Sequence, residues 1–287
     1  MPDGPPTRLA HAKANLFLRV LAREASGYHG LETLFCLLSL ADRLSAERRE
    51  GDAVSIEVQG MEVGPAADNL AVRAAEMVLQ ATGRRFGVHL TLEKRIPVQA
   101  GLGGGSSDAA AALVLTNQLA GNAVPRHELL QFAARLGSDV PFFLSEARLA
   151  LAWGHGERML RLPPLPAAPA LLLVPPEGMP TGEAYAWIDE GGAASRRGGL
   201  ALDLEALRGW GDVARMAGND FEAPLFARRP KLKEAFEALV ATRPLLCRLT
   251  GSGSAFLAVY RSEGDRAEAL MMLGRKHGQV LEVVAGG

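Results

Sequence analysis

The sequence predicts an α+β protein with two domains. Three features lead to this prediction: apolar residues recur with period two in some segments and with helical spacing in others, such segments alternate through the first half, and seven prolines between positions 163 and 180 separate the halves. A length of 287 residues also suits two domains at roughly 150 residues each. We therefore expect domains at residues 1–164 and 165–287.

Period-two alternation predicts three strands in the first half. In residues 12–18, alanines and leucines occupy every second position, which is typical of a half-buried strand. Residues 55–58 form a shorter alternating segment. In residues 87–96 the apolar side chains again fall on one face, and Pro97 ends the strand because proline cannot donate a ladder hydrogen bond.

Helical spacing predicts three helices, each followed within two residues by a glycine suited to a C-cap: residues 69–82, 107–119 and 126–136. Just beyond the third helix we expect Val140 to be extended, since a following proline, Pro141, disfavours the helical backbone.

The second half predicts a smaller α+β sandwich. A short apolar run predicts a buried strand at 170–174. The other expected elements are helices at 202–207, 220–227, 231–241 and 265–277, a hairpin made by 247–250 and 255–260, and a final strand at 280–284.

Composition excludes several classes of protein. The 31 Lys and Arg residues nearly balance 32 Asp and Glu residues, which argues against a protein that coats nucleic acid or an acidic membrane. Cys36 and Cys247 lie in apolar segments and offer neither a disulfide framework nor a paired-cysteine metal site. No segment reaches the roughly 18 apolar residues of a membrane helix, and the N-terminus lacks a signal-peptide pattern. We expect a cytoplasmic protein that binds no membrane.

The segment P-V-Q-A-G-L-G-G-G-S-S-D at 97–108 is the most informative in the chain. Four glycines in five positions let the backbone approach a ligand closely, and the loop leads from a strand to a helix N-terminus, where unpaired N–H groups favour an anion such as a triphosphate. It lacks the Gly-Lys-Ser/Thr of a Walker A loop and the third glycine of the dinucleotide fingerprint. The alternative is a flexible turn capped by Ser107 or Asp108.

This loop resembles the P-x-x-x-G-L-G-G-G-S-S motif of the GHMP kinases, and further motifs follow the family's order across essentially the whole chain. They are A-K-A-N-L-F-L at 12–18, G-Y-H-G-L-E-T at 27–33, D-N-L at 68–70, G-S-D-V-P at 137–141, N-D at 219–220 and L-T-G-S-G at 249–253. The resemblance implies the two-domain GHMP kinase fold: an N-terminal, ribosomal-protein-S5-domain-2-like domain that binds ATP, a C-terminal ferredoxin-like α+β domain, and a cleft between them.

The resemblance assigns the catalytic roles to Lys13 and Asp139. A carboxylate can accept the proton of an attacking alcohol, and a lysine beside it would hold it ionised and offset charge on the transferred phosphoryl group. From the residues alone, Lys13 and Asn15 share one strand face, which is either a site or a solvated face with a protective lysine. The plainer reading of Asp139 is a turn or helix cap.

ATP and Mg²⁺ are the cofactors that the resemblance implies. The expected ATP-binding residues are Asn69, Lys94, Pro97, Val98, Gln99, Ala100, Gly101, Leu102, Gly103, Gly104, Gly105, Ser106 and Ser107, and the ligands of the metal ion stay unassigned. Without the resemblance, Asn69 is a helix N-cap and Lys94 a solvated strand lysine.

The G-Y-H segment implies a small-molecule substrate with a cytidine diphosphate moiety. The expected substrate-binding residues are Asn15, Tyr28, His29, Thr181 and Tyr185, with Tyr28 and Tyr185 stacked on the two faces of the cytosine ring and His29 hydrogen-bonded to its edge.

Two other functions stay open at this point. One is another GHMP kinase, such as a homoserine or mevalonate kinase, which would not be expected to carry the Tyr28-His29 element. The other is a nucleic-acid-binding module, against which the balanced charge argues. We expect no nucleic-acid partner, and a monomer or weak homodimer.

Overall fold

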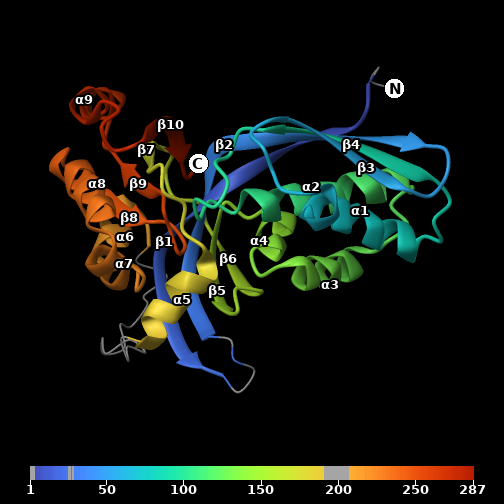
Figure 1. The fold of residues 1–287 in the computed structure, drawn as a ribbon, viewed down its shortest axis with the longest axis horizontal. Helices are drawn as coiled ribbons and strands as arrows, with labels where there is room; N and C mark the ends of the chain where they lie inside the picture. Colours follow the sequence, from blue (N-terminus) through green and yellow to red (C-terminus); the bar gives the residue numbers. More distant parts are fainter. Residues whose placement is uncertain (1–3, 25–26, 28, 191–206, 217) are drawn as a thin grey trace. The chain divides into compact units, whose positions relative to one another are not determined.

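The computed structural model describes residues 4–24, 27, 29–190, 207–216 and 218–287 (Figure 1). The chain forms two compact units. The first comprises Met1–Ala12, Leu40–Val98 and Gly103–Ala147, and the second comprises Lys13–Ser39, Gln99–Leu102 and Arg148–Gly287. The domain boundary expected near residue 164 stays a prediction.

Two long strands contribute residues to both units. Strand β1 (Thr7–Arg23) contains the predicted strand at 12–18, and it pairs with β2 (His29–Arg49). The sequence analysis missed β2. Residues 33–36 of β2 are all buried, so both faces of the strand are covered and its apolar residues run consecutively instead of alternating.

The first unit packs four helices against a small sheet. Strand β3 (Val54–Gly60) pairs parallel with β4 (Gly87–Lys94), which pairs antiparallel with residues 43–49 of β2. The short 3-10 helix η1 (Ala66–Asp68) and α1 (Leu70–Ala81) connect β3 to β4, as a parallel pair requires. Helices α2 (Gly104–Leu119), α3 (Arg126–Leu136) and α4 (Val140–Ser145) complete the core. The strands predicted at 55–58 and 87–96 and all three predicted helices of this half are confirmed.

The expectation of an extended Val140 is wrong. Val140 is the first residue of α4, and Asp139 before it already has a helical backbone with φ −84° and ψ −18°. Pro141 lies in the first turn of the helix, where its missing N–H costs no helical hydrogen bond. Buried packing of Val140 and Phe142 outweighs the local preference of a residue before proline.

The second unit is built around β7 (Ala168–Val174), which pairs antiparallel with β10 (Gln279–Ala285) and β9 (Phe256–Val259); β8 (Leu246–Leu249) pairs with β9. Helices α5 (Thr181–Glu190), α6 (Trp210–Met216), α7 (Glu222–Arg228), α8 (Pro230–Ala241) and α9 (Glu263–Leu273) belong to the same unit. Strand β5 (Leu149–Gly154) pairs with residues 31–36 of β2 and with β6 (Arg158–Leu162).

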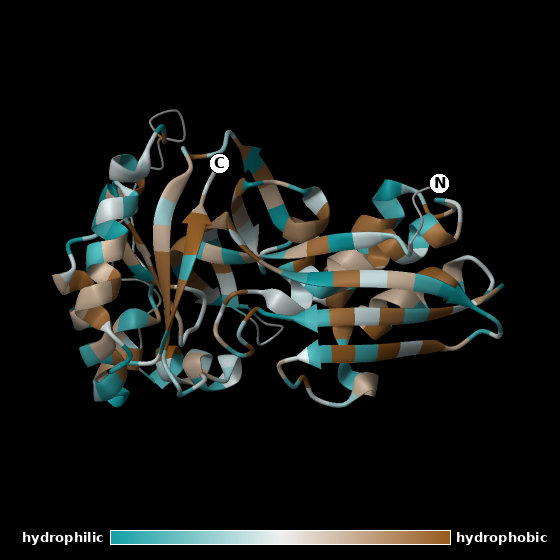
Figure 2. Cartoon of the chain, turned by 90° about the horizontal axis from the view of Figure 1, so that it is seen from above, coloured by the Kyte–Doolittle hydropathy of each residue, from teal (hydrophilic) through white to brown (hydrophobic). Residues whose placement is uncertain are grey.

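Most elements predicted for this half are confirmed, namely those at 170–174, 220–227, 231–241, 247–250, 255–260, 265–277 and 280–284. The helix expected at 202–207 lies outside the described residues, and the sequence analysis missed β5, β6, α5 and α6. In Figure 2, hydrophobic residues (brown) recur along the strands of both units, with hydrophilic ones (teal) between them.

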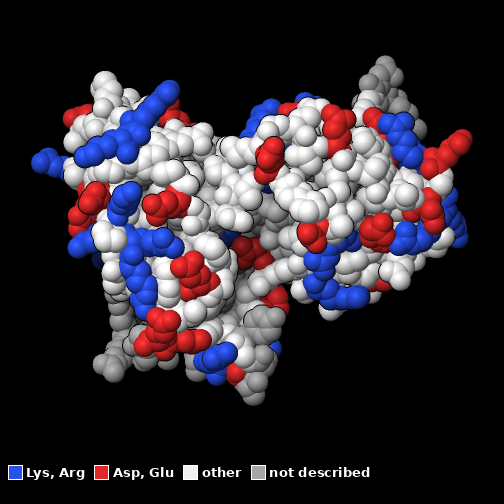
Figure 3. All heavy atoms as spheres, in the orientation of Figure 1, with Lys and Arg blue, Asp and Glu red and all other residues white. Residues whose placement is uncertain are grey.

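The surface carries mixed charge. On the face that Figure 3 shows, acidic and basic side chains lie interspersed over both units. Of the helices that the structure describes, none combines the length and the apolar character needed to span a bilayer.

Candidate active site

The glycine loop joins β4 to α2, as predicted, and leaves the N-terminus of α2 uncapped. Gly103 occupies the N-cap position in the left-handed conformation (φ 70°) and no side chain caps the helix. Ser107 donates its N–H to the Gly103 carbonyl, so the N–H groups preceding it in the first turn remain for a ligand or solvent. Ser107 and Asp108 lie inside the helix and not at its cap, so the reading of a turn capped by them is wrong.

Two glycines of the loop are also required by close packing. A Cβ on Gly101, whose φ is +75°, would lie 2.1 Å from the carbonyl oxygen of Thr250. A Cβ on Gly104 would lie 2.9 Å from Nζ of Lys94. Larger residues at either position would displace the loop even before a ligand binds.

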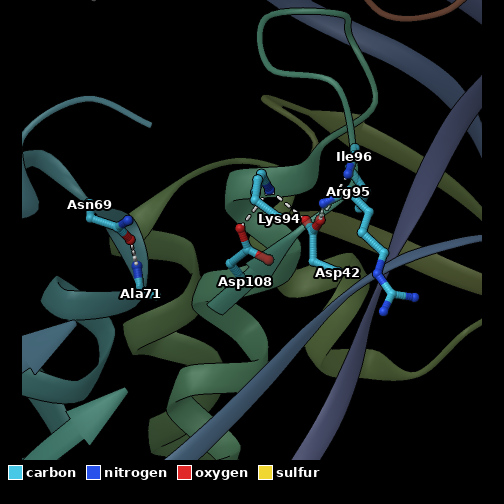
Figure 4. Close-up of polar contacts among 7 residues, drawn as sticks. All are labelled: Asp42, Asn69, Ala71, Lys94, Arg95, Ile96 and Asp108. Atoms are coloured by element: carbon cyan, nitrogen blue, oxygen red, sulfur yellow. Dashed lines mark hydrogen bonds and ion pairs between the residues drawn. The ribbon is translucent and has the colours of Figure 1, made fainter. Parts of the chain in front are cut away.

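Lys94 lies between two buried carboxylates (Figure 4). Its Nζ donates to Oδ2 of Asp42 at 2.5 Å and to Oδ2 of Asp108 at 2.7 Å. The other oxygen of Asp42 accepts the backbone N–H groups of Arg95 and Ile96. The cluster therefore ties β2, the end of β4 and the first turns of α2 together. The reading of Lys94 as a solvated strand lysine is wrong, because the residue is only 5% exposed.

Asp108 is the incompletely paired member of this cluster. Its Oδ1 is buried without a hydrogen-bond partner within the described part of the chain. Burial raises the pKa of Asp108 to about 7; the Lys94 ammonium opposes that rise and the nearby Asp42 carboxylate adds to it. One cation lies between two carboxylates, so the cluster is neutral when Asp108 holds a proton and carries one negative charge when it does not.

Asn69 takes the position of a helix cap. Its side-chain oxygen accepts the N–H of Ala71 at 2.9 Å at the start of α1 (Figure 4). The interpretation of Asn69 as a helix N-cap is therefore confirmed. Contact with ATP stays a prediction, and it concerns the side-chain NH₂ group of Asn69.

In the second unit, Lys13 belongs to a buried polar chain. Its Nζ donates to Oδ1 of Asn15 at 2.7 Å and to the carbonyl of Gly101 at 3.0 Å. The amide of Asn15 in turn donates to Oγ1 of Thr33, which donates to the carbonyl of Phe17. Lys13 and Asn15 are each 3% exposed, so the alternative of a solvated strand face is wrong. The same Gly101 carbonyl accepts the hydroxyl of Thr250.

Asp139 lies at the start of α4, in the first unit. Its side chain makes no capping hydrogen bond, and α4 packs on α2. A Cβ on Gly137, two residues earlier, would lie 4.0 Å from Oγ of Ser106. The G-S-D segment therefore approaches the start of α2. Asp139 belongs to the short connection between α3, which ends at Leu136, and α4, which begins at Val140.

The residues expected around the cytidine moiety are in the second unit. His29 stacks on Tyr185, with ring centroids 5.4 Å apart and an interplanar angle of 22°, and Nε2 of His29 lies 2.8 Å from Oδ1 of Asp189. Thr181 accepts the hydroxyl of Ser252 at 3.3 Å. Tyr28 lies outside the described residues.

Three contributors to these networks were not among the expected site residues. Thr33 and Thr250 do lie in motifs that the sequence displays. Thr33 is the last residue of G-Y-H-G-L-E-T, and Thr250 is the second residue of L-T-G-S-G. No pattern marks Asp42, which sits in an ordinary strand segment and contacts Lys94 only because β2 and β4 pair.

Comparison with known proteins identifies the class. The family model described as the GHMP kinases N terminal domain matches residues 69–146, and the GHMP kinases C terminal model matches residues 203–279. The chain therefore belongs to the GHMP kinase family and is an ATP-dependent phosphotransferase with the two-domain fold that the motifs predicted.

Two relatives and one solved structure carry the name of the same enzyme. The 4-diphosphocytidyl-2-C-methyl-D-erythritol kinase of Parvibaculum lavamentivorans is 38% identical over 99% of both chains, and that of Delftia acidovorans is 40% identical over 91% of this chain and 88% of its own. A crystal structure of 4-(cytidine 5'-diphospho)-2C-methyl-D-erythritol kinase superimposes with a TM-score of 0.82 at 38% identity, covering 98% of this chain and 100% of that one. Mevalonate kinase of Methanococcus jannaschii, with a TM-score of 0.69 over 99% of both chains at 11% identity, shares the fold alone.

Proposed function

We propose that this protein uses ATP to phosphorylate the 2-hydroxyl of 4-diphosphocytidyl-2-C-methyl-D-erythritol, a step in non-mevalonate isoprenoid precursor synthesis. The observation that carries the proposal is 38% identity over 99% of the chain to a kinase of that name. Homoserine and mevalonate kinases share the fold at only 11–18% identity.

The glycine loop and the N-terminus of α2 are the proposed site of the ATP phosphates. The uncapped first turn offers N–H groups and the positive end of the helix dipole. Among the described residues, no group of three or more histidine, cysteine or acidic side chains could hold a metal ion. Mg²⁺ commonly binds through substrate phosphates and water with one or two protein ligands, so we expect it to enter the site with ATP. When bound, the ion would neutralise phosphate charge.

Asp139 is the proposed base. As the substrate oxygen forms its bond to the γ-phosphorus, the bond from phosphorus to the leaving oxygen of ADP breaks and the hydroxyl proton passes to the carboxylate. Lys13 is the proposed source of positive charge for the transferred group. Its ammonium is held in a defined place by Asn15 and by the Gly101 carbonyl, which costs little reorganisation during transfer.

We assign the cytidine moiety to the face of the second unit that carries His29 and Tyr185. The two rings are already stacked, which makes a preformed aromatic surface. Tyr28, Thr181 and Asn15 complete the expected set of substrate contacts. Lys94 and Asn69 stay predicted contacts for the nucleotide. The two hydrogen bonds of the Lys94 ammonium, to Asp42 and Asp108, favour a role through the shape of the loop.

The decisive experiment is a coupled assay of ADP release with the purified protein, Mg²⁺, ATP and each of three acceptors. We expect turnover with 4-diphosphocytidyl-2-C-methyl-D-erythritol and at most background with homoserine or mevalonate. Equal or faster turnover with either of the other acceptors would contradict the proposal.

Three further expectations belong to this proposal: a cytoplasmic location, a monomer or weak homodimer, and no binding to nucleic acid. Sedimentation over a range of concentrations and filter binding at moderate salt would test the last two.

A further inference from the structure

A carboxylate lies behind the histidine of the proposed cytidine site. His29 opens β2, and Asp189 lies in the last turn of α5. Nε2 of His29 and Oδ1 of Asp189 are 2.8 Å apart, and the His29 side chain is only 8% exposed. The ring of Tyr185, one turn earlier on α5, stacks on the imidazole and itself meets Phe221 edge-on at 5.0 Å. The imidazole therefore has one defined plane and one defined partner.

Helix stability alone does not account for Asp189. A negative side chain in the last turn of a helix opposes the negative end of the helix dipole. Contacts with β1 and β2 compensate for this unfavourable position. Oδ2 of Asp189 lies 3.5 Å from the Arg23 guanidinium, and Oδ1 lies 2.8 Å from Nε2 of His29. The geometry thus directs the carboxylate to the imidazole and away from its own helix.

This contact determines which ring nitrogen carries the proton. An ionised carboxylate can only accept a hydrogen bond, so Nε2 of His29 must donate. In the neutral imidazole the other nitrogen, Nδ1, is then an acceptor. Nδ1 of His29 makes no hydrogen bond to any other residue that the structure describes.

We propose that Asp189 is a positioning residue that holds His29 with Nδ1 as an acceptor and so selects a base whose edge presents an amino donor. Cytosine presents its exocyclic amino group, whereas uracil presents a carbonyl oxygen at the same place, which faces an acceptor unfavourably. The inference rests on the proposed function, because that function supplies the cytidine, and it adds the group that makes the site choose cytosine over uracil.

The test compares the cytidine substrate with its uridine counterpart in steady-state assays at pH 8.5, with Asp189→Asn and Asp189→Ala as the variants. We expect the ratio of kcat/KM for cytidine over uridine to fall about tenfold or more in both variants, which corresponds to about 1.4 kcal/mol. The KM for ATP and the kcat at saturating cytidine substrate should change less than about twofold. Asp189→Glu, which keeps a carboxylate, should recover part of the ratio.

Glu190→Gln is the matched control. Glu190 is the neighbouring acid in the same turn, but it pairs with Arg228 at 2.6 Å and not with His29, so its loss should leave the base preference unchanged. A second readout is independent of activity: ¹⁵N NMR of the ring nitrogens should show His29 protonated at Nε2 in the wild type and a mixture of tautomers in Asp189→Asn.

Two results would overturn the inference. One is an unchanged cytidine-to-uridine ratio in folded Asp189 variants, even if both KM values rise, because that pattern marks a merely structural role. The other is His29 protonated at Nδ1 in the wild type. Failure of the proposed function looks different, since the wild-type enzyme would then not phosphorylate the cytidine substrate at all.

Discussion

Replacing Asp108 by asparagine should remove a pH dependence of stability that comes from the buried charge cluster of the first unit. The substitution retains an oxygen that can accept the hydrogen bond from Nζ of Lys94. It removes the carboxyl group, which is 3% exposed and whose Oδ1 is unpartnered within the described residues. The change therefore isolates the ionisation of this group with little change of shape.

The sign follows from proton binding. The pKa of Asp108 rises from its ordinary 3.8 to about 7 in the folded protein, mainly through burial, so the folded chain holds the proton more tightly than the unfolded chain. The free energy of unfolding therefore falls as the pH rises from about 4 to about 7, and the loss is complete above that range. At about 1.4 kcal/mol per unit, the rise corresponds to about 4 kcal/mol.

Urea unfolding followed by circular dichroism between pH 4.5 and 8 measures the effect. We expect the stability of Asp108→Asn relative to wild type to increase by about 3 kcal/mol from pH 4.5 to pH 8, because only the wild type loses stability through this group. Asp52→Asn is the control, since Asp52 is exposed on the same unit. Taking differences from wild type cancels the titration of all other groups.

A stability difference that stays constant from pH 4.5 to 8 would refute the reasoning. It would mean that attraction to Lys94 outweighs burial and keeps Asp108 ionised throughout. A ¹³C NMR titration of the Asp108 carboxyl group would separate the two cases directly.

Three further predictions concern the site. Asp139→Asn should lower turnover by about 10²-fold or more with ATP affinity nearly unchanged, and near-normal turnover would remove Asp139 from the mechanism. Gly104→Val should weaken ATP binding in calorimetry, because even a Cβ would lie 2.9 Å from Nζ of Lys94; unchanged affinity in a folded variant would exclude the loop as phosphate site. Thr33→Val should lower the free energy of unfolding by about 1–3 kcal/mol in denaturant unfolding, because the Asn15 amide loses its acceptor. The same variant should lower kcat, and its KM for ATP should change less than its kcat. A variant as stable and active as wild type would show that Thr33 does not support Lys13.

Local patterns predicted much of the fold because local forces decide those parts. The helices α1, α2 and α3 and the strands β4 and β7 follow from periodicity and from the residues that end each element. Two failures have a common cause. Strand β2 is covered on both faces, so its sequence does not alternate, and α4 forms where burial of Val140 overrides the preference set by Pro141. In both cases contacts with distant segments decide the outcome.

The class of chemistry can be read from the amino-acid sequence: a glycine-rich loop lies between a strand and a helix, and Lys13 and Asp139 lie in motifs that resemble those of one family of kinases. The partners of the charged and polar side chains, in contrast, become known from the folded chain. The tertiary structure placed Asp42 against Lys94, Thr33 behind Asn15 and Asp189 behind His29. Each of these pairs lies 18 or more residues apart, so no local periodicity records it. Burial then gives such pairs their strength, because a low-dielectric interior penalises every polar group that lacks a partner.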